Sequence, residues 1–251
     1  MNSDRRNSSK ELSEQEKIRY NRQIILPGIG LGGQKKLKNS KVFIAGAGGL
    51  GSPISIYLAT AGVGKITIVD KDDVELSNLN RQILHWEKDL DRAKTESAKE
   101  KLKMINSDME IETITTQIDD KNALDLIKSS DVILDAMDNF PTRFILNKVA
   151  LELDIPFIHG AIYGLEGRTT TIIPNRTACL RCLFKDSPPE RTFPVLGVTP
   201  GIIGIIEATE AIKFLTGVGE LLENRLLIFD GEFLKFYEIE ISKDPKCPDC
   251  G

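Results

Sequence analysis

The sequence contains neither a long apolar run nor a long run of basic residues. Its most apolar stretch, residues 201–215, is interrupted by Glu207, Glu210 and Lys213, so it falls short of the about 20 apolar residues that a membrane span needs. The net charge of −4 argues against nucleic acid as the main partner. These absences favour a soluble protein that acts on neither membranes nor nucleic acid.

The first ten residues also lack the apolar segment of a signal peptide. They are polar, so we expect residues 1–11 to form a disordered tail, and we expect a cytoplasmic protein. Hydrophobic residues make up 41% of the 251 residues and charged residues 28%, as is usual for a soluble enzyme. No internal repeat or low-complexity linker divides the chain, and its length suits one α/β domain, which we predict over residues 12–251.

Cysteine is scarce, and all four cysteines fall in two C-x-x-C pairs: Cys179 with Cys182, and Cys247 with Cys250. Two such pairs can supply the four thiolates of a tetrahedral Zn²⁺ site. The alternatives are two disulfides, which are disfavoured in a cytosolic chain, or a redox C-x-x-C, which needs only one pair. We therefore predict a structural zinc site that fastens the C-terminal segment to the domain and has no catalytic role.

A glycine motif follows the first predicted strand. Gly46, Gly48 and Gly51 have the G-x-G-x-x-G spacing, between an apolar run at residues 42–45 and a predicted helix at residues 53–62. In such a motif the glycines permit a tight turn, the approach of backbone to a phosphate, and close packing of helix on strand. A second strand, residues 65–70, ends in Asp70, whose carboxylate suits a ribose hydroxyl. Strand, turn, helix and acid together predict a nucleotide site rather than a merely structural turn.

More polar residues follow other predicted strands. The segment 71–82 leaves the carboxyl end of the second strand, so Asn78, Arg81 and Gln82 are expected near the nucleotide. The strand at residues 131–135 runs into Asp138 in the same way. Lys94 lies in the first turn of a predicted helix, where the helix dipole disfavours a cation. Either Lys94 is solvated, or a phosphate compensates its charge.

The order of elements predicts an α/β fold. Strands are expected at residues 42–45, 65–70, 109–118, 131–135 and 156–159, with helices at residues 53–62, 91–105 and 141–153. This alternation predicts a Rossmann-like, doubly wound, mostly parallel sheet. From Gly167 onward, strands at residues 168–173, 226–229 and 234–241 are expected to extend the sheet in antiparallel fashion, with a helix at residues 202–215.

The N-terminal segment is expected to be helical. A helix is predicted over residues 11–20, with Ser13 as its N-cap and Glu16 completing a capping box. A glycine-rich turn containing Gly28, Gly30, Gly32 and Gly33 is then expected before a short basic helix.

These motifs together resemble the MoeB/ThiF/HesA family, the bacterial and archaeal relatives of ubiquitin-activating enzymes. The resemblance runs from about residue 11 to the last cysteine pair. It is carried by residues 19–23, the glycine motif at residues 46–52, Asp70, residues 77–82, Lys94, Asp138, Asn139 and both cysteine pairs. It implies an adenylyltransferase, closest to the MoeB type, that works as a homodimer with ATP, Mg²⁺ and Zn²⁺.

The implied reaction joins a protein to AMP. The C-terminal glycine carboxylate of a small ubiquitin-like sulfur carrier, ending in Gly-Gly, attacks the α-phosphate of ATP and gives acyl-AMP and pyrophosphate. A sulfur donor, a persulfide-bearing enzyme, then displaces AMP to leave a thiocarboxylate for molybdopterin or thiamin synthesis. Such a reaction needs cations around the phosphates and little acid–base chemistry, because the attacking carboxylate is already ionised.

The resemblance also implies the site residues. Asp138 would hold Mg²⁺, Arg81 and Lys94 would bind phosphates, Asn78 would position them, and Asp70 would take the ribose hydroxyls. Backbone at Gly48 and Gly49 would approach the nucleotide, and the rest of the nucleotide site would comprise Ser77, Leu79, Asn80 and Asn139. Arg22, otherwise an ordinary surface charge, would reach into the neighbouring subunit's site as an arginine finger.

One departure from the family pattern concerns the covalent step. Relatives that bind their carrier covalently use a cysteine in the loop after the first cysteine pair, whereas residues 190–197 contain none. An adenylation without a covalent enzyme intermediate is therefore favoured.

Three other functions remain to be weighed. An NAD-dependent dehydrogenase would also use the glycine motif and Asp70, but Arg22, Arg81, Lys94 and Asp138 suit a metal-bound triphosphate better than a dinucleotide. A noncatalytic, zinc-fastened scaffold would be expected to lack this charged set. A relative that adenylates a small peptide or a tRNA base is not distinguished by the sequence.

Overall fold

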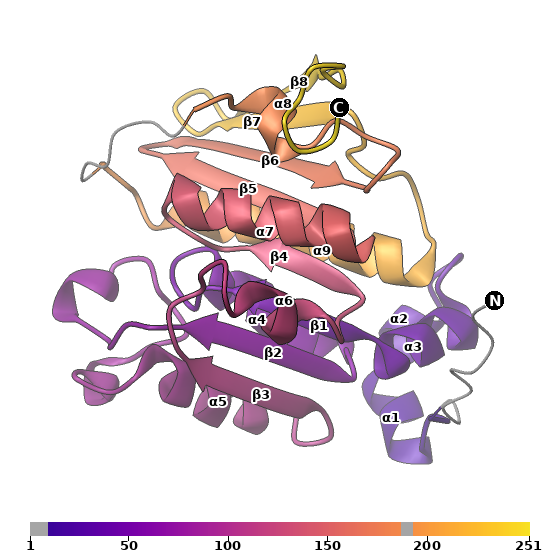
Figure 1. The fold of residues 1–251 in the computed structure, drawn as a ribbon. Coiled ribbons are helices and arrows are strands. Elements are labelled where there is room, and N and C mark those ends of the chain that lie inside the picture. The colour runs from indigo at the N-terminus through magenta and orange to yellow at the C-terminus, as the bar shows by residue number, and fades with distance from the viewer. Residues whose placement is uncertain (1–9, 187–192) are drawn as a thin grey trace.

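The computed structural model describes residues 10–186 and 193–251, which form one eight-stranded sheet with helices on both faces (Figure 1). The strand order is β3-β2-β1-β4-β5-β6-β7-β8. Pairing is parallel from β3 to β5 and antiparallel from β5 to β8. The predicted mostly parallel sheet with an antiparallel extension is confirmed.

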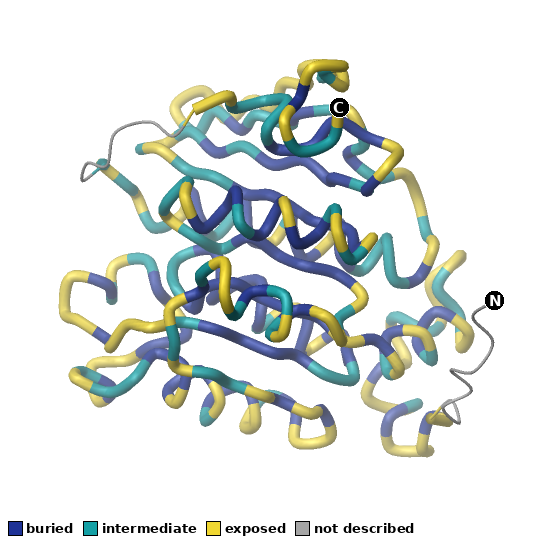
Figure 2. The backbone as a smooth tube through the Cα atoms, in the orientation of Figure 1, coloured by how far each residue is buried: buried dark blue, intermediate teal, exposed yellow. Residues whose placement is uncertain are grey.

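The strands lie close to the predicted ranges. They are β1 (Lys41–Ala45), β2 (Lys65–Asp70), β3 (Glu110–Thr115), β4 (Val132–Asp135), β5 (Phe157–Tyr163), β6 (Glu166–Ile172), β7 (Arg225–Asp230) and β8 (Lys235–Glu240). The four residues of β4 are all buried, as expected for a parallel strand covered on both faces. The edge strand β8 is exposed along its whole length (Figure 2).

Two apolar cores lie on the two faces of the sheet, because successive side chains of a strand point to opposite faces. Val42 and Ile44 of β1 join the first core, whereas Phe43 and Ala45 join the second. The first core is covered by α3 (Gly30–Asn39), α4 (Gly51–Ala61), α5 (Lys94–Ile105) and α9 (Val198–Thr216). The second is covered by α6 (Ala123–Ile127), α7 (Phe140–Leu153) and the short α8 (Leu180–Leu183).

The N-terminal helices differ in part from expectation. The capping box of Ser13 and Glu16 is present at the start of α1 (Glu14–Arg19), and α2 (Asn21–Ile24) follows. The predicted turn at Gly30, Gly32 and Gly33 is wrong, because α3 already begins at Gly30. Tertiary packing of α3 against α9 outweighs the weak helix propensity of its glycines. A small residue suits position 33 because a Cβ on Gly33 would lie 3.0 Å from Ile29 Cγ2.

Two further segments refine the predicted boundaries. α5 begins three residues later than expected, at Lys94, because Asp91 has φ of 64° and cannot belong to a right-handed helix. The segment after β2 contains two short 3₁₀ turns, η1 (Leu76–Asn78) and η2 (Glu87–Asp89). Of the predicted tail at residues 1–11, residues 1–9 lie outside the described residues, while the Lys10 backbone N–H donates to Asn39 Oδ1 at 2.8 Å.

Among the helices within the described ranges, none combines the length and apolarity that crossing a membrane requires.

The end of α4 contacts Tyr20, which follows α1. Gly62 terminates α4 with φ of 85°, and a Cβ there would lie 2.5 Å from Tyr20 Cζ. The Tyr20 hydroxyl accepts a hydrogen bond from Asn106 Nδ2 at 2.9 Å, which holds the ring in place. Gly62 is therefore required both by its backbone conformation and by its neighbour.

We predict that Gly62→Ala destabilises the protein by at least about 2 kcal/mol, since left-handed backbone costs an L-residue roughly 1–2 kcal/mol and the new methyl would press on Tyr20. Gly32→Ala is the matched control. Gly32 is exposed within α3 and a Cβ there meets nothing within 4 Å, so this change should stabilise by about 0.5–1 kcal/mol. Urea unfolding followed by circular dichroism measures both; equal stabilities for the two variants would contradict the packing described.

Candidate functional site

The glycine motif forms a tight turn between β1 and α4, pressed against the end of β4. A Cβ on Gly46 would lie 2.7 Å from the Ala136 carbonyl oxygen, and one on Gly51 would lie 2.1 Å from the Gly46 carbonyl oxygen. Gly46 also has φ of 102°. Gly46 and Gly51 are thus required by the backbone packing. Gly48 faces the segment 77–82, and a Cβ on it would lie 3.7 Å from Gln82. Gly49 faces α9, and a Cβ on it would lie 3.2 Å from Pro200.

Asp70 ends β2 beside this turn, as predicted. Its Oδ2 accepts the Ala47 N–H at 2.7 Å, and its Oδ1 accepts the Asp72 N–H at 2.9 Å. The carboxylate therefore braces the glycine turn from the carboxyl end of the neighbouring strand.

The segment 77–82 lies over the turn. Asn78 is buried and its Oδ1 accepts the Glu75 N–H at 3.2 Å, whereas Ser77 and Asn80 are exposed and Leu79 is half-buried. The Arg81 guanidinium donates to the Ser77 carbonyl at 2.8 Å and to Asn80 Oδ1 at 2.9 Å. Its side chain also reaches Gly49, where a Cβ would lie 3.6 Å from Arg81 Cγ.

Gln82 follows Arg81, and its Oε1 is buried without a hydrogen-bond partner among the described residues. An unpaired buried acceptor is costly unless a ligand or water satisfies it, so Gln82 Oε1 is a candidate ligand contact beside Gly48.

Lys94 is the first residue of α5 and is buried, with 7% of its side chain exposed. Its Nζ lies 3.1 Å from Asp72 Oδ2. Of the two alternatives for Lys94, this burial excludes a solvated surface lysine. Sequence reasoning also missed Asp72, although its place two residues after Asp70 was a usable signal.

Asp138 follows β4 at the same sheet edge as Asp70, with an exposed side chain. Asn139 caps α7 by accepting the Thr142 N–H at 3.0 Å, and its Nδ2 donates to Asp138 Oδ1 at 3.3 Å. Asp138 is thus a free carboxylate held next to a helix N-terminus.

A buried polar cluster supports the turn that carries Asp138, and sequence reasoning missed it. Asp135 Oδ2 lies 2.6 Å from His159 Nδ1, and its Oδ1 accepts the Met137 N–H at 3.0 Å. Arg143 donates to the carbonyls of Met137 at 2.5 Å and Gly160 at 3.0 Å. Burial lowers the pKa of His159 even though Asp135 opposes this change.

Glu207 of α9 lies under this cluster. Burial, and then the charge of Asp135, raise the pKa of Glu207 well above its usual range, which favours the neutral acid. Both carboxyl oxygens lack a hydrogen-bond partner among the described residues.

Arg22 is the one predicted site residue that lies apart from the others. It is exposed on α2, and the neighbouring Gln23 donates to the Ala61 carbonyl at 3.1 Å, at the C-terminal end of α4. The glycine turn is at the other end of that 11-residue helix, about 16 Å away at 1.5 Å per residue (Figure 1). Within one protomer, α2 therefore lies at the end of α4 remote from the glycine turn.

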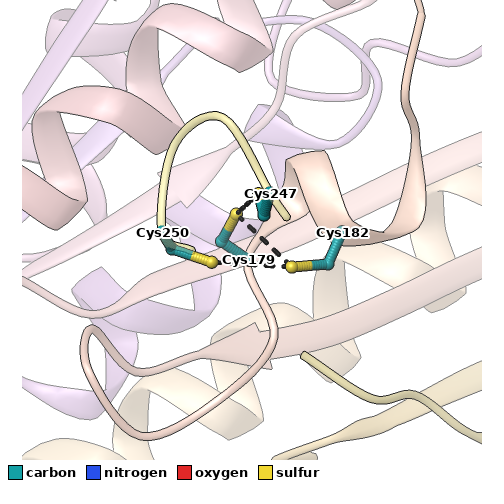
Figure 3. A group of neighbouring side chains, drawn as sticks. All are labelled: Cys179, Cys182, Cys247 and Cys250. Atoms are coloured by element: carbon teal, nitrogen blue, oxygen red, sulfur yellow. Dashed lines mark hydrogen bonds between the residues drawn. The ribbon is translucent and has the colours of Figure 1, made fainter. Parts of the chain in front are cut away.

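The four cysteines converge as predicted (Figure 3). Their sulfur atoms all lie within 4.8 Å of one another, with 3.5 Å between Cys179 and Cys247, 3.5 Å between Cys182 and Cys250, and 4.0 Å between Cys179 and Cys182. Tetrahedral Zn–S bonds of about 2.3 Å place sulfurs roughly 3.8 Å apart, whereas a disulfide requires about 2.05 Å. The cluster is compatible with zinc, and the thiols are free.

The electrostatics of the cysteine cluster also suit a cation. Burial raises the pKa of Cys179 and raises that of Cys250 to about 11. Burial also opposes ionisation of Cys247, but the backbone N–H groups of Asp249 and Cys250 lower its pKa. A bound dication would supply the charge that four thiolates need. Asn147 of α7 holds both segments, since it donates to Asp249 Oδ2 and accepts the Leu180 N–H, each at 2.8 Å.

Comparison with known proteins is consistent with this arrangement. The ThiF family model matches residues 20–249. The SAMP-activating enzyme E1 of Haloferax volcanii is 44% identical over 239 residues, which cover 93% of this chain and 88% of that protein. The sulfur carrier protein adenylyltransferase of Thermus thermophilus is 38% identical, covering 95% of this chain and 92% of the relative.

Other relatives are longer. The adenylyltransferase and sulfurtransferase MOCS3-1 of Zea mays is 42% identical over 93% of this chain, but the chain spans only 51% of its length. Among solved structures, E. coli MccB with ATP superposes with a TM-score of 0.84 at 26% identity, covering 93% of this chain and 74% of MccB. The ThiF family model covers most of the chain, and the relatives named as adenylyltransferases are 38% and 42% identical over nearly all of it, so this chain belongs to the ThiF family of adenylyltransferases.

Proposed function

We propose that this protein adenylates the C-terminal glycine of a small ubiquitin-like sulfur-carrier protein ending in Gly-Gly. The products would be acyl-AMP and pyrophosphate. The observation that carries the proposal is the meeting of the glycine turn, Asp70, Arg81 and the buried Lys94 at one edge of the sheet, which suits a triphosphate better than a dinucleotide. The named functions of the Haloferax and Thermus relatives support the carrier as the second substrate.

The proposed roles follow from charge. Attack of a carboxylate on the α-phosphate builds negative charge on phosphoryl oxygens, which Arg81 and Lys94 would stabilise. Lys94 is paired with Asp72 and its side chain is already largely buried. Water therefore screens its attraction to a phosphate only weakly. A ribose hydroxyl would donate to the Asp70 carboxylate, either beside the Ala47 N–H or in its place.

Asp138 is proposed as the magnesium ligand. Its carboxylate is exposed at the carboxyl end of β4, and oxygen donors of this kind suit Mg²⁺. When bound, Mg²⁺ would neutralise charge on the phosphates and so favour departure of pyrophosphate. Asn139 holds the Asp138 side chain and the start of α7 in register.

The second stage is proposed to be noncovalent with respect to this chain. A persulfide-bearing sulfur donor would displace AMP from the carrier to give the thiocarboxylate used in molybdopterin or thiamin synthesis. Residues 190–197 contain no cysteine, and the four cysteines present are proposed to hold one Zn²⁺. Residues 187–192 of that loop lie outside the described part of the chain.

A small peptide is the second candidate substrate, because the sequence does not distinguish it from a carrier protein. A microcin C7 biosynthetic enzyme, MccB in complex with N-formylated MccA, has the same fold, with a TM-score of 0.85 at 26% identity. ATP–pyrophosphate exchange with carriers ending in Gly-Gly, compared with short peptides, decides between the two substrates. Retention of NADH rather than ATP by the purified protein would instead favour a dehydrogenase.

We predict that Asp138→Ala reduces carrier-dependent ATP–pyrophosphate exchange to background while the fold survives, because the proposed magnesium ligand is lost. Arg81→Ala and Lys94→Ala should each reduce the rate by about a hundredfold, the usual effect of losing a transition-state charge donor. Asp125→Ala is the control: Asp125 is exposed on α6 and, within the described residues, pairs only with Lys128, so exchange should stay at the wild-type rate. Wild-type exchange in a folded Asp138→Ala protein would refute the assignment.

The proposed homodimer predicts complementation. If Arg22 acts in the partner subunit's site, a mixture of inactive Arg22→Ala and inactive Asp138→Ala chains should regain a fraction of wild-type exchange. Each mixed dimer would then contain one site with both residues intact. Mass spectrometry must first confirm that subunits exchange; mixed dimers that stay inactive would remove the role of Arg22 in trans.

The proposed zinc site predicts one Zn²⁺ per chain by elemental analysis. Cys250→Ser should lose the metal and lower the melting temperature by roughly 5–10 °C, because metal binding contributes directly to folding. Lys246→Ala, which changes an exposed side chain next to Cys247, should keep both metal and melting temperature. Zinc-free wild-type protein with a disulfide inside either pair would overturn this prediction.

A further inference from the structure

His85 contacts two of the segments that border the glycine turn, and it has no role in the function proposed above. It is one of only two histidines in the chain and is 3% exposed. Its Nε2 lies 2.9 Å from the Ala47 carbonyl oxygen, and its Nδ1 lies 2.8 Å from Ser97 Oγ. His85 itself follows Arg81 and Gln82, so it joins this segment to the glycine turn and to α5.

The hydrogen bonds fix the tautomer of His85. A carbonyl oxygen can only accept, so Nε2 carries the hydrogen and Nδ1 accepts from the Ser97 hydroxyl. The Ser97 oxygen in turn accepts from Lys101 Nζ at 2.9 Å. Burial, and then the positive charges of Lys94 and Lys101, lower the pKa of His85, which agrees with a neutral ring.

The far end of this chain of hydrogen bonds is an ion pair. Lys101 pairs with the fully buried Asp89, which also accepts the Trp86 N–H at 2.9 Å and the Arg92 guanidinium at 2.9 Å. The Lys101 ammonium only donates and the Ala47 carbonyl only accepts, so with a neutral His85 ring the bonds run from Lys101 through Ser97 and His85 to the Ala47 carbonyl.

The same face of α5 carries Lys94, Ser97 and Lys101, since these residues are three and four apart. The helix that presents the proposed phosphate-binding cation therefore also holds His85. A fixed His85 sets the position of the glycine turn relative to that cation.

The consequence for the turn concerns the two peptide groups that meet at Ala47, Gly46–Ala47 and Ala47–Gly48. The Ala47 N–H is held by Asp70 and the Ala47 carbonyl by His85. In a trans peptide the N–H points opposite to the carbonyl, so the Gly48 N–H is directed away from His85. Among the described residues, the Gly48 N–H donates to no protein atom.

We propose that His85 is a positioning residue, which locks the Ala47–Gly48 peptide so that the Gly48 N–H faces the phosphates of the bound nucleotide. Without it, the glycine peptide can flip and turn its carbonyl toward the phosphates. The inference rests on ATP as the substrate of the function proposed above.

The test is ATP affinity, measured by calorimetry without carrier and as the KM for ATP in the exchange assay. His85→Phe keeps a flat ring but removes both hydrogen bonds, so affinity should fall on the order of tenfold, as for a lost hydrogen bond to a charged group. The KM for the carrier should not change. His85→Gln offers an N–H in place of Nε2 and should recover most of the loss.

The control is Lys103→Met on the same helix. Lys103 donates to the Met109 carbonyl at 2.6 Å, at the end of α5 remote from the glycine turn. This variant should lower the melting temperature without changing ATP affinity. If His85→Phe also lowers only the melting temperature, His85 is merely structural and the proposal is wrong. If His85→Phe does not fold, Ser97→Ala replaces it and should weaken ATP binding about threefold; unchanged affinity there also overturns the proposal.

A second readout needs no activity. Two-dimensional ¹H–¹⁵N spectra of the imidazole rings should show opposite tautomers for the two histidines. His85 should carry its hydrogen on Nε2, and His159, which donates from Nδ1 to Asp135, should carry it on Nδ1. A hydrogen on Nδ1 of His85 would overturn the proposal. Wild-type protein that binds ATP but exchanges no pyrophosphate with any carrier would refute the proposed function while leaving His85 testable by calorimetry.

Discussion

The turn after β1 and the turn after β4 approach so closely that no side chain fits between them. The carbonyl oxygen of Ala136 occupies the space where Gly46 would carry a Cβ, and the carbonyl oxygen of Gly46 occupies the space where Gly51 would carry one. This contact lies where the strand order reverses, between β1 and β4, which is where open α/β sheets bind ligands. It fixes the start of α4 and lies at the edge of the sheet where Asp70 ends β2 and Asp138 follows β4.

Polar groups around this contact are held by partners from distant parts of the chain. Asp70 binds the Ala47 N–H and His85 binds the Ala47 carbonyl. In the other turn, Asp135 binds the Met137 N–H and Arg143 binds the Met137 carbonyl. Both turns are thus fixed by side-chain hydrogen bonds as well as by steric contact. Preorganised backbone of this kind costs no rearrangement when a charged ligand arrives.

Most of the fold could be predicted from the sequence, because apolar runs, the capping box at Ser13 and the glycine spacing are local signals. The spacing of the two C-x-x-C pairs likewise predicted that the four cysteines lie together. The pairing of Lys94 with Asp72, the tautomer of His85 and the cluster around Asp135 could not be predicted, because each depends on contacts that no periodicity records. The helical start of α3 was missed for a similar reason: this helix packs against α9, which comes about 170 residues later in the sequence, and that packing outweighs the weak helix propensity of its glycines.

The position of α9 has a consequence for how the chain acquires its structure during synthesis. Ile203, Ala208 and Ala211 of α9 belong to the same core as Ile54 and Leu58 of α4. Gly204 fits so tightly over α4 that a Cβ would lie 2.6 Å from Pro53, and a Cβ on Gly49 would lie 3.2 Å from Pro200. While a ribosome has released only the first five strands, the part of α4 that packs on α9 has no covering helix (Figure 1). The nascent chain therefore exposes apolar surface beside the glycine turn until Thr216 has emerged, so that α9 covers α4 and approaches Gly49 in the same step.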